Sequence, residues 1–151
     1  MVDAIDLKIL RVLQQEPDIP MTELGMRVGL SHTPCWRRIK QMEAQGVIRG
    51  RALLLDPAQV ELDVSVICFV KLNHHDEDAL NAFEAEVMRL PFVVQCYSMS
   101  GEHDYLLRVV SRDVKHYEEF VKRSLLHLPS VAFVNSSFAL REVKNVTVLP
   151  V

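Results

Sequence analysis

The chain has 151 residues, 49% of them hydrophobic, which is enough for one ordinary domain or two small ones with packed cores. Its formal net charge of −3 excludes a protein that coats nucleic acid by overall attraction, so any DNA contact requires a local basic patch. The longest apolar stretch, residues 64–70, is far shorter than the roughly 20 residues of a membrane span, and Asp3 and Asp6 stand where a signal peptide is basic. We therefore expect a cytoplasmic protein with no membrane partner.

Three helices are predicted in the first 46 residues. Apolar residues recur at helical spacing over 4–13, and a Glu-Pro-Asp sequence ends that pattern. A second, short helix is predicted over 22–28, followed by Gly29, which can take the left-handed backbone that ends a helix. Ser31 is expected to cap a third helix by accepting hydrogen bonds from the following amides, and this helix continues to about Gln45.

After residue 46 the pattern becomes extended, and residues 47–58 are predicted to be a linker. Four β-rich segments then alternate with two amphipathic helical stretches in the order β-α-β-β-α-β. The strands are predicted at 64–72, 93–100, 105–110 and 131–140, and the helical stripes comprise Leu80, Phe83, Val87 and Leu90, then Val114, Tyr117, Val121 and Leu125. With a tight connection at Gly101, this order predicts a ferredoxin-like domain over 59–151. The fold class is therefore α+β.

One face of the predicted sheet lacks a cover. The segment 64–70 is apolar at both alternating positions, and such strands are normally buried on both faces. The two predicted helices cover one face, and no further segment of the chain is left for the other. A second copy of the same sheet is the simplest cover, so we expect a two-fold homodimer through the C-terminal domain.

The second and third predicted helices have the layout of a helix-turn-helix within residues 1–46. On the third helix Cys35, Ile39 and Met42 share one face, which predicts that they form its core side. A core position for Trp36 is the alternative by residue type, but the helical spacing favours an outward one. We expect the DNA-contacting residues to be Ser31, His32, Thr33, Trp36, Arg37, Arg38 and Lys40. The basic patch of residues 36–51 comprises Arg37, Arg38, Lys40, Arg49 and Arg51, with Glu43 as its single acid.

The sequence resembles the leucine-responsive regulatory protein and asparagine-synthetase regulator (feast/famine) family along essentially its whole length. In the first half the similar segments are Ile5-Asp6 through Leu10, Glu23-Leu24, Val28-Gly29-Leu30-Ser31 and Thr33-Pro34-Cys35. In the second half they are Gln45-Gly46-Val47-Ile48, Ala52-Leu53-Leu54-Leu55-Asp56-Pro57, Gly101 through Val109 and Ser136-Ser137-Phe138. Any one segment is a weak match, but the same succession across two domains makes accidental similarity improbable.

The resemblance implies a transcriptional regulator that binds double-stranded DNA. It also implies that residues 59–151 bind an amino acid or similar effector, and that dimers gather into octamers. Carried over by position, the effector pocket comprises Ser100, Gly101, Glu102, Asp104 and Tyr105, with Ser136 and Ser137 facing them. Amides at the glycine can receive a carboxylate, and the acids can accept from an ammonium group. Taken alone, residues 101–104 also fit a simple polar hairpin turn. The sequence departs from the family pattern at Pro20, Trp36 and His103, so operator and effector stay open.

Other groupings of reactive residues indicate no chemistry. His74, His75, Asp76 and Asp78 lack a second ligand pair at metal spacing, and a solvated loop is the better interpretation. The three cysteines, Cys35, Cys68 and Cys96, lack paired spacing and fit free thiols. We expect no cofactor, metal or catalytic residue. The alternative from another class is a small ferredoxin-like enzyme that would use Tyr105, His103 and Asp104 for acid-base work.

Overall fold

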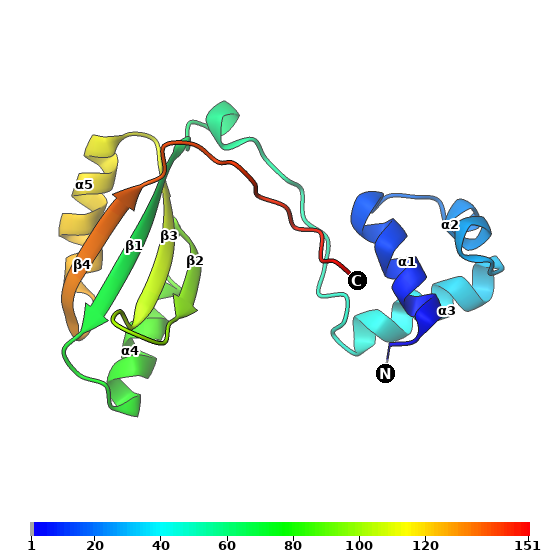
Figure 1. The fold of residues 1–151 in the computed structure, drawn as a ribbon, viewed down its shortest axis with the longest axis horizontal. Coiled ribbons are helices and arrows are strands. Elements are labelled where there is room, and N and C mark those ends of the chain that lie inside the picture. The colour runs from blue at the N-terminus through cyan, green and yellow to red at the C-terminus, as the bar shows by residue number, and fades with distance from the viewer. Residues whose placement is uncertain (1) are drawn as a thin grey trace. The chain divides into compact units, whose positions relative to one another are not determined.

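The structure is a computed structural model that describes residues 2–151, and these residues form two compact units. The helical unit contains the chain up to Leu54 together with Lys144–Val151, and the sheet unit contains Leu55–Val143. Each unit has its own cluster of buried apolar side chains, so each has its own core. Figure 1 shows that the first unit is helical and that the second contains a twisted sheet.

The helical unit is built from α1 (Ala4–Gln15), α2 (Met21–Val28) and α3 (His32–Ala44). Asp3 begins α1 with a capping box, in which its side chain accepts from the amide of Asp6 and the Asp6 side chain accepts from the amide of Asp3. Gly29 ends α2 with φ of 75°, the left-handed conformation that favours glycine. The core consists of Ile9, Leu24, Val28, Cys35, Ile39 and Met42.

The three predicted helices are confirmed, with bounds that differ by one or two residues. Ser31 does stand at the N-cap of α3, but in the described part of the chain its side chain accepts no cap hydrogen bond. The expected role of its hydroxyl is therefore wrong. Gly25 permits a close approach within the turn, because a Cβ at this position would lie 2.5 Å from the carbonyl oxygen of Leu30.

The sheet unit has the predicted ferredoxin-like order. Its elements are β1 (Val64–Leu72), α4 (Glu77–Val87), β2 (Val93–Ser98), β3 (Tyr105–Ser111), α5 (Val114–Arg123) and β4 (Val131–Phe138). The strands are hydrogen-bonded in the order β2-β3-β1-β4, and each neighbouring pair is antiparallel. Strands β1 and β3 pair at the centre, and β1 also pairs with β4, so two of the three pairs join strands that are not consecutive in sequence; this order confirms the expected α+β fold class.

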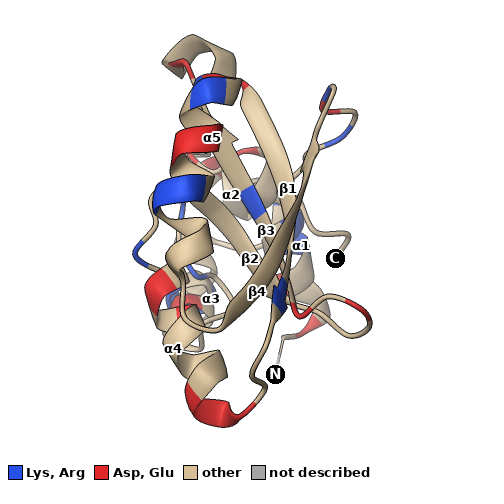
Figure 2. Cartoon of the chain, turned by 90° about the vertical axis from the view of Figure 1, so that its left-hand side faces the viewer, with Lys and Arg blue, Asp and Glu red and all other residues tan. Residues whose placement is uncertain are grey.

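Helices α4 and α5 both cover the same face of the sheet. Alternate residues of β1 and β3 are fully buried against Phe83 of α4 and against Tyr117 and Phe120 of α5. The opposite face, which we call the open face, carries the intervening side chains. The strand register places the following residues on the open face: Ser65, Ile67, Phe69 and Lys71 of β1, Leu106, Arg108 and Val110 of β3, Gln95 and Tyr97 of β2, and Phe133, Asn135 and Ser137 of β4. Figure 2 shows how little charge the strands carry compared with the helices.

Three features differ from the sequence-based expectations. Val114 is 60% exposed and does not belong to the predicted core stripe, whereas Tyr117 and Leu125 are buried, Val121 packs against the same core, and Phe120 joins them. The chain forms a short 3₁₀ helix, η1 (Pro57–Val60), where the linker was expected to stay extended, because the Asp56 carboxylate accepts from the amide of Ala58. Another 3₁₀ helix, η2 (Leu125–His127), follows α5.

The C-terminal end of the chain also differs from the predicted division. Residues 59–151 were expected to form one domain, but Lys144–Val151 group with the helical unit. The physical reason is that β4 ends at Phe138 and the following chain forms its contacts elsewhere. The amide of Leu149, for example, donates to the side chain of Gln14 on α1. Among residues 2–151, no helix is both long enough and apolar enough to span a bilayer.

Candidate DNA-binding and effector sites

The outward face of α3 is the candidate DNA-binding surface. Cys35, Ile39 and Met42 are at most 3% exposed and turn one side of this helix into the core. The helical period therefore directs the remaining predicted residues outward together. Trp36 is 49% exposed, which confirms the outward position over the core alternative. Ser31, His32, Thr33, Arg37 and Lys40 are also exposed.

Arg37 and Arg38 differ in what their guanidinium groups contact. Arg38 donates to Asp3 at 2.6 Å and to Asp6 at 2.9 Å, so it joins α3 to the start of α1. These carboxylates raise the pKa of Arg38, and the pKa of Asp3 is lowered, first by the Asp6 amide and then by Arg38. Arg37 takes part in none of the ion pairs found among residues 2–151, and its charge faces solvent. Of these two arginines, Arg37 is therefore the one whose guanidinium is exposed and outside the ion pairs of the described residues.

The connection between β2 and β3 is the candidate effector site. Ser100, Gly101 and Glu102 are exposed, and Gly101 has φ of 110°, a conformation that residues with a side chain rarely adopt. The amide of Asp104 donates to the carbonyl of Val70 at 2.9 Å, which holds the end of this turn on β1. The turn thus has an exposed tip and an end that is held on β1.

The Asp104 carboxylate is already engaged inside the protein. It accepts from the amide of Leu72 at 2.7 Å, from His75 Nε2 at 3.1 Å and from Lys71 Nζ at 3.5 Å. Burial alone would raise the pKa of Asp104, but the hydrogen bonds and the nearby positive charges outweigh it and leave the pKa below its ordinary value. Asp104 thus stays ionised and positions the turn against the end of β1.

The other predicted effector residues point in different directions. The Tyr105 side chain is 2% exposed on the face covered by α4, where its hydroxyl donates to Glu84 at 2.7 Å. Burial and then Glu84 raise the pKa of Tyr105. Ser136 lies on the same face and hydrogen-bonds to the hydroxyl of Tyr117 at 2.6 Å. Ser137 is its neighbour in β4 and lies on the open face. Strand alternation therefore separates these two serines.

His103 lies at the edge of the open face. Its ring packs at 5.0 Å from the ring of Phe69 and at 6.1 Å from that of Phe133, measured between centroids. Within the described residues its Nδ1 atom is buried without a hydrogen-bond partner. His103 and Tyr105 thus lie on opposite faces of the sheet, and the acid-base set required by the enzyme alternative does not converge.

The remaining reactive residues have structural contacts. Asp76 caps α4 by accepting from the amide of Ala79, and His75 contacts Asp104. Across residues 2–151 no cluster of three or more His, Cys, Asp or Glu side chains could hold a metal ion. Cys35 and Cys68 are free and buried, Cys96 is free and half-buried, and burial raises the pKa of each thiol.

Comparison with known proteins matches both units. Residues 2–49 match the model for winged helix-turn-helix DNA-binding domains, and residues 65–149 match the model for the Lrp/AsnC ligand binding domain. The chain belongs to the Lrp/AsnC family of transcriptional regulators. The family match confirms the resemblance seen in the sequence, and it identifies this chain as a regulator with a DNA-binding and a ligand-binding domain.

Individual relatives cover nearly the full chain. The DNA-binding transcriptional activator DecR of Escherichia coli is 38% identical over 151 residues, which is 100% of this chain and 99% of that protein. The leucine-responsive regulatory protein of Rhizobium meliloti is 38% identical over 95% of this chain and 92% of its own length. An AsnC family regulator from Agrobacterium tumefaciens superposes with a TM-score of 0.92 at 44% identity, covering 98% of this chain and 96% of that one. A regulator from Neisseria meningitidis, solved as an L-Met complex, superposes with a TM-score of 0.92 at 39% identity. The match covers 99% of this chain and 97% of that one.

Sequence reasoning missed the residues that hold the candidate sites in place. Asp3 and Asp6 orient Arg38 across more than 30 positions, and Lys71 and His75 contact Asp104 across about as many. No local pattern reports such contacts. The spacing of Asp3 and Asp6, three residues apart, could have indicated the capping box. The periodicity of α1 does not indicate that these two acids also bind an arginine of α3.

Proposed function

We propose that this regulator reads double-stranded DNA with the outward face of α3. Arg37 is the residue for a guanine edge, Trp36 and Thr33 suit thymine methyl groups, and Lys40 suits a phosphate. Ser31 and His32, at the start of the helix, would lie nearest the groove floor. We assign Arg38 to holding α3 on α1, because both of its partners are carboxylates of the same unit. The observation that carries the proposal is the exposure of this residue set on one helical face.

We further propose that an amino acid is the effector and binds at the β2–β3 turn. The relative from Neisseria meningitidis was solved with L-Met, and it matches this chain over 99% of its length. The amides around Gly101 suit the ligand carboxylate, and Glu102 is the exposed acid available for its ammonium group. Asp104 acts as a positioning residue, because its oxygens already accept from β1 and His75. Ser100 lies at the exposed rim of this turn, whereas Ser137 lies opposite Ile67 on the open face and Tyr105 and Ser136 lie on the helix-covered face.

The open face supports assembly into a homodimer. It carries exposed aromatic groups, with Tyr97 at 52% and Phe133 at 46% exposure, beside the half-buried Ile67 and Phe69. A second copy that covers this face would bury these side chains through a two-fold interface. A dimer presents two copies of α3 to half-sites one or more helical turns apart, and further assembly into octamers would contact several sites. The regulator would act in the cytoplasm, with no cofactor and no catalytic residue.

An electrophoretic mobility shift on the DNA upstream of the protein's own gene tests the proposal. The assay includes nonspecific competitor and is repeated with each of the twenty amino acids. Arg37→Ala is expected to weaken specific binding by roughly 5- to 150-fold, the value of one base contact of about 1–3 kcal/mol, with a smaller loss of nonspecific binding. Arg89→Ala, in the turn that follows α4, is the matched control, because it removes the same charge from the sheet unit.

Each outcome of this assay has a definite meaning. A specific shift that one amino acid changes by about 5-fold or more supports both sites, since couplings of that size are typical of allosteric regulators. Asp104→Ala is expected to keep ligand-free DNA binding and to lose the effector response. Equal losses of DNA binding in Arg37→Ala and Arg89→Ala would contradict the assignment of α3, and equal loss of both activities in Asp104→Ala would contradict the assignment of the turn.

A further inference from the structure

The C-terminal segment Thr147–Val151 is bound to α1. The Gln14 side chain makes two hydrogen bonds to the backbone of Leu149. The Leu149 amide donates to Gln14 Oε1 at 2.7 Å, and Gln14 Nε2 donates to the Leu149 carbonyl at 3.2 Å. Arg11 Nε donates to the main-chain oxygen of Val151 at 2.5 Å. This two-point pairing between a side-chain amide and a backbone resembles a strand pair and fixes the register of the segment on the helix.

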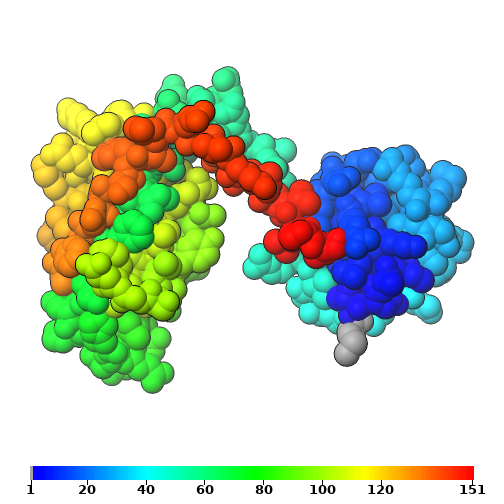
Figure 3. All heavy atoms as spheres, viewed as in Figure 1, coloured from blue at the N-terminus to red at the C-terminus, as the bar shows by residue number. Residues whose placement is uncertain are grey.

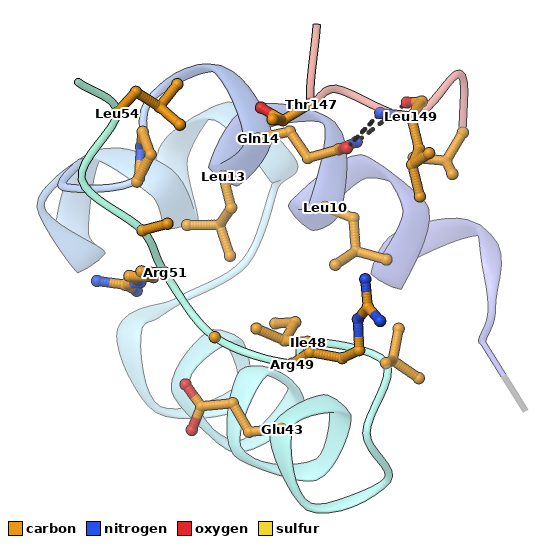
Figure 4. A pocket seen from close by; sticks show the side chains of 15 residues that line it. Leu10, Leu13, Gln14, Glu43, Ile48, Arg49, Arg51, Leu54, Thr147 and Leu149 are labelled. Atoms are coloured by element: carbon orange, nitrogen blue, oxygen red, sulfur yellow. Dashed lines mark hydrogen bonds between the residues drawn. The ribbon is translucent and has the colours of Figure 1, made fainter. Parts of the chain in front are cut away.

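The docked segment forms one wall of an apolar groove. The groove has a volume of about 750 Å³ and is lined on the α1 side by Leu10 and Leu13. Thr147, Leu149 and Val151 line it from the segment, at alternate positions as expected for an extended chain. Figure 4 shows Leu10 and Leu13 of α1 near the groove and the paired bonds between Gln14 and Leu149, and Figure 3 shows the red segment against the blue surface of the helical unit.

Helix α1 connects this docking surface with the candidate DNA-binding helix. Arg11 and Gln14 lie near the C-terminal end of α1. At its N-terminal end, Asp3 and Asp6 hold Arg38 of α3. A helix of 12 residues transmits a displacement along its length, because its backbone hydrogen bonds keep it rigid. We therefore expect a change in how the segment binds α1 to reach Arg38, in the middle of α3.

The chain that leads to this segment comes from the sheet unit. It leaves β4 after Phe138, in the unit that holds the candidate effector turn, and returns to the helical unit at Lys144. The chain thus passes between the units twice, after Leu54 and after Val143. Leu149 is 66% exposed and Val148 43%, so the docked segment is shallowly buried and can detach without unfolding either core.

We propose that Thr147–Val151 is a docking strap whose binding to α1 sets the DNA affinity of α3 and carries the effector signal to it. The effector part of this proposal rests on the proposed function. The partner of the α1 surface is the protein's own C-terminal segment, recognised by its backbone and by alternate apolar side chains. When the segment is docked, it restrains α1 and therefore the carboxylates of Asp3 and Asp6 that bind Arg38. When the segment is released, α1 loses these contacts and restrains α3 less.

Docking is tested first, without DNA, by amide hydrogen exchange on the full-length protein. The Leu149 amide is expected to exchange at least about tenfold more slowly than in an unstructured chain, and Gln14→Ala is expected to remove this protection. Gln15→Ala is the matched control, because Gln15 is the neighbouring exposed glutamine of α1 and should leave the protection unchanged. Unprotected Leu149 in the native protein, or unchanged protection in Gln14→Ala, would overturn the docking.

The regulatory step is tested by mobility shift on the same upstream DNA, with and without an equimolar mixture of the twenty amino acids. Gln14→Ala and removal of residues 147–151 are both expected to reduce the response to the mixture to less than about twofold, from an initial response of about fivefold or more. Gln15→Ala should respond like the native protein. A full response in both strap variants would overturn the strap as a signal carrier. Failure of the native protein to bind DNA would instead overturn the proposed function and, with it, the signalling role, while the exchange result would still decide whether the segment docks.

Discussion

The helical unit and the sheet unit present their candidate sites in different ways. In the helical unit the exposed set around Trp36 and Arg37 comes from one helix and lies on one face. In the sheet unit the candidate residues come from a turn and a distant strand, and neighbours such as Ser136 and Ser137 lie on opposite faces. The helical surface is therefore assembled locally, whereas the effector turn depends on contacts made across the sheet.

This difference implies that the two units respond separately to substitution. The protein has one tryptophan, Trp36, and it lies on α3, so its fluorescence reports the helical unit alone. Amide exchange in β1 and β3 reports the sheet unit.

Gly25→Ala should destabilise the helical unit by about 3 kcal/mol, the upper end for overpacking, because the new Cβ would lie 2.5 Å from the Leu30 carbonyl. Thermal unfolding followed by Trp36 fluorescence measures this loss. Gly29→Ala is the control: within the described residues nothing lies within 4 Å of its Cβ, but its φ of 75° costs about 1 kcal/mol. A larger loss at Gly29, or a loss of stability in the sheet unit of either variant, would contradict the separate response of the two units.

Asp104→Asn should destabilise the sheet unit by about 2 kcal/mol at pH 7, because the carboxylate loses its charge-assisted bonds to His75 and Lys71. The folded protein lowers the pKa of Asp104 below the unfolded value of about 3.9. Its contribution is therefore complete above that value and is lost as the pH falls through the lowered pKa. Amide exchange and thermal unfolding at pH 7 and pH 3 measure the difference between native and variant protein, which should shrink in acid; a constant difference would contradict the role of the charge.

Arg38→Ala should lower the unfolding midpoint of the helical unit by a few degrees, because Asp3 and Asp6 lose the guanidinium that joins α1 to α3. Arg37→Ala should leave this midpoint nearly unchanged while it weakens DNA binding. Fluorescence-detected unfolding and mobility shifts on both variants separate the two roles. Identical profiles for the two variants would refute the division between a positioning arginine and a contacting one.

Ser136→Ala should destabilise the sheet unit by about 1 kcal/mol, because the Tyr117 hydroxyl loses its 2.6 Å bond to Ser136 and keeps only the contact with Cys68 at 3.0 Å. Ser137→Ala, one position along β4 on the open face, should change stability by less than about 0.5 kcal/mol. Denaturant unfolding followed by circular dichroism measures both variants. A larger effect at Ser137 would contradict the assigned faces of β4.

The features that depend on local periodicity could be predicted from the sequence alone. The three helices, the four strands and the ferredoxin-like order follow from helical and alternating spacing, and the outward position of Trp36 follows from the core face of Cys35 and Ile39. The family resemblance was also readable, because it rests on short segments in a fixed order. Local spacing failed at Val114, where the helix begins before it reaches the core.

Which candidate residues keep free polar atoms depends on contacts that form only in the folded chain. The carboxylates that hold Arg38, the partners that engage Asp104 and the clasp of Leu149 on Gln14 all join residues that are far apart in the chain. Such contacts depend on how the elements pack, and packing is set by the summed fit of many side chains rather than by any one segment. For that reason a residue's type and position predict that it faces outward, but only its neighbours in space determine whether its polar atoms remain available.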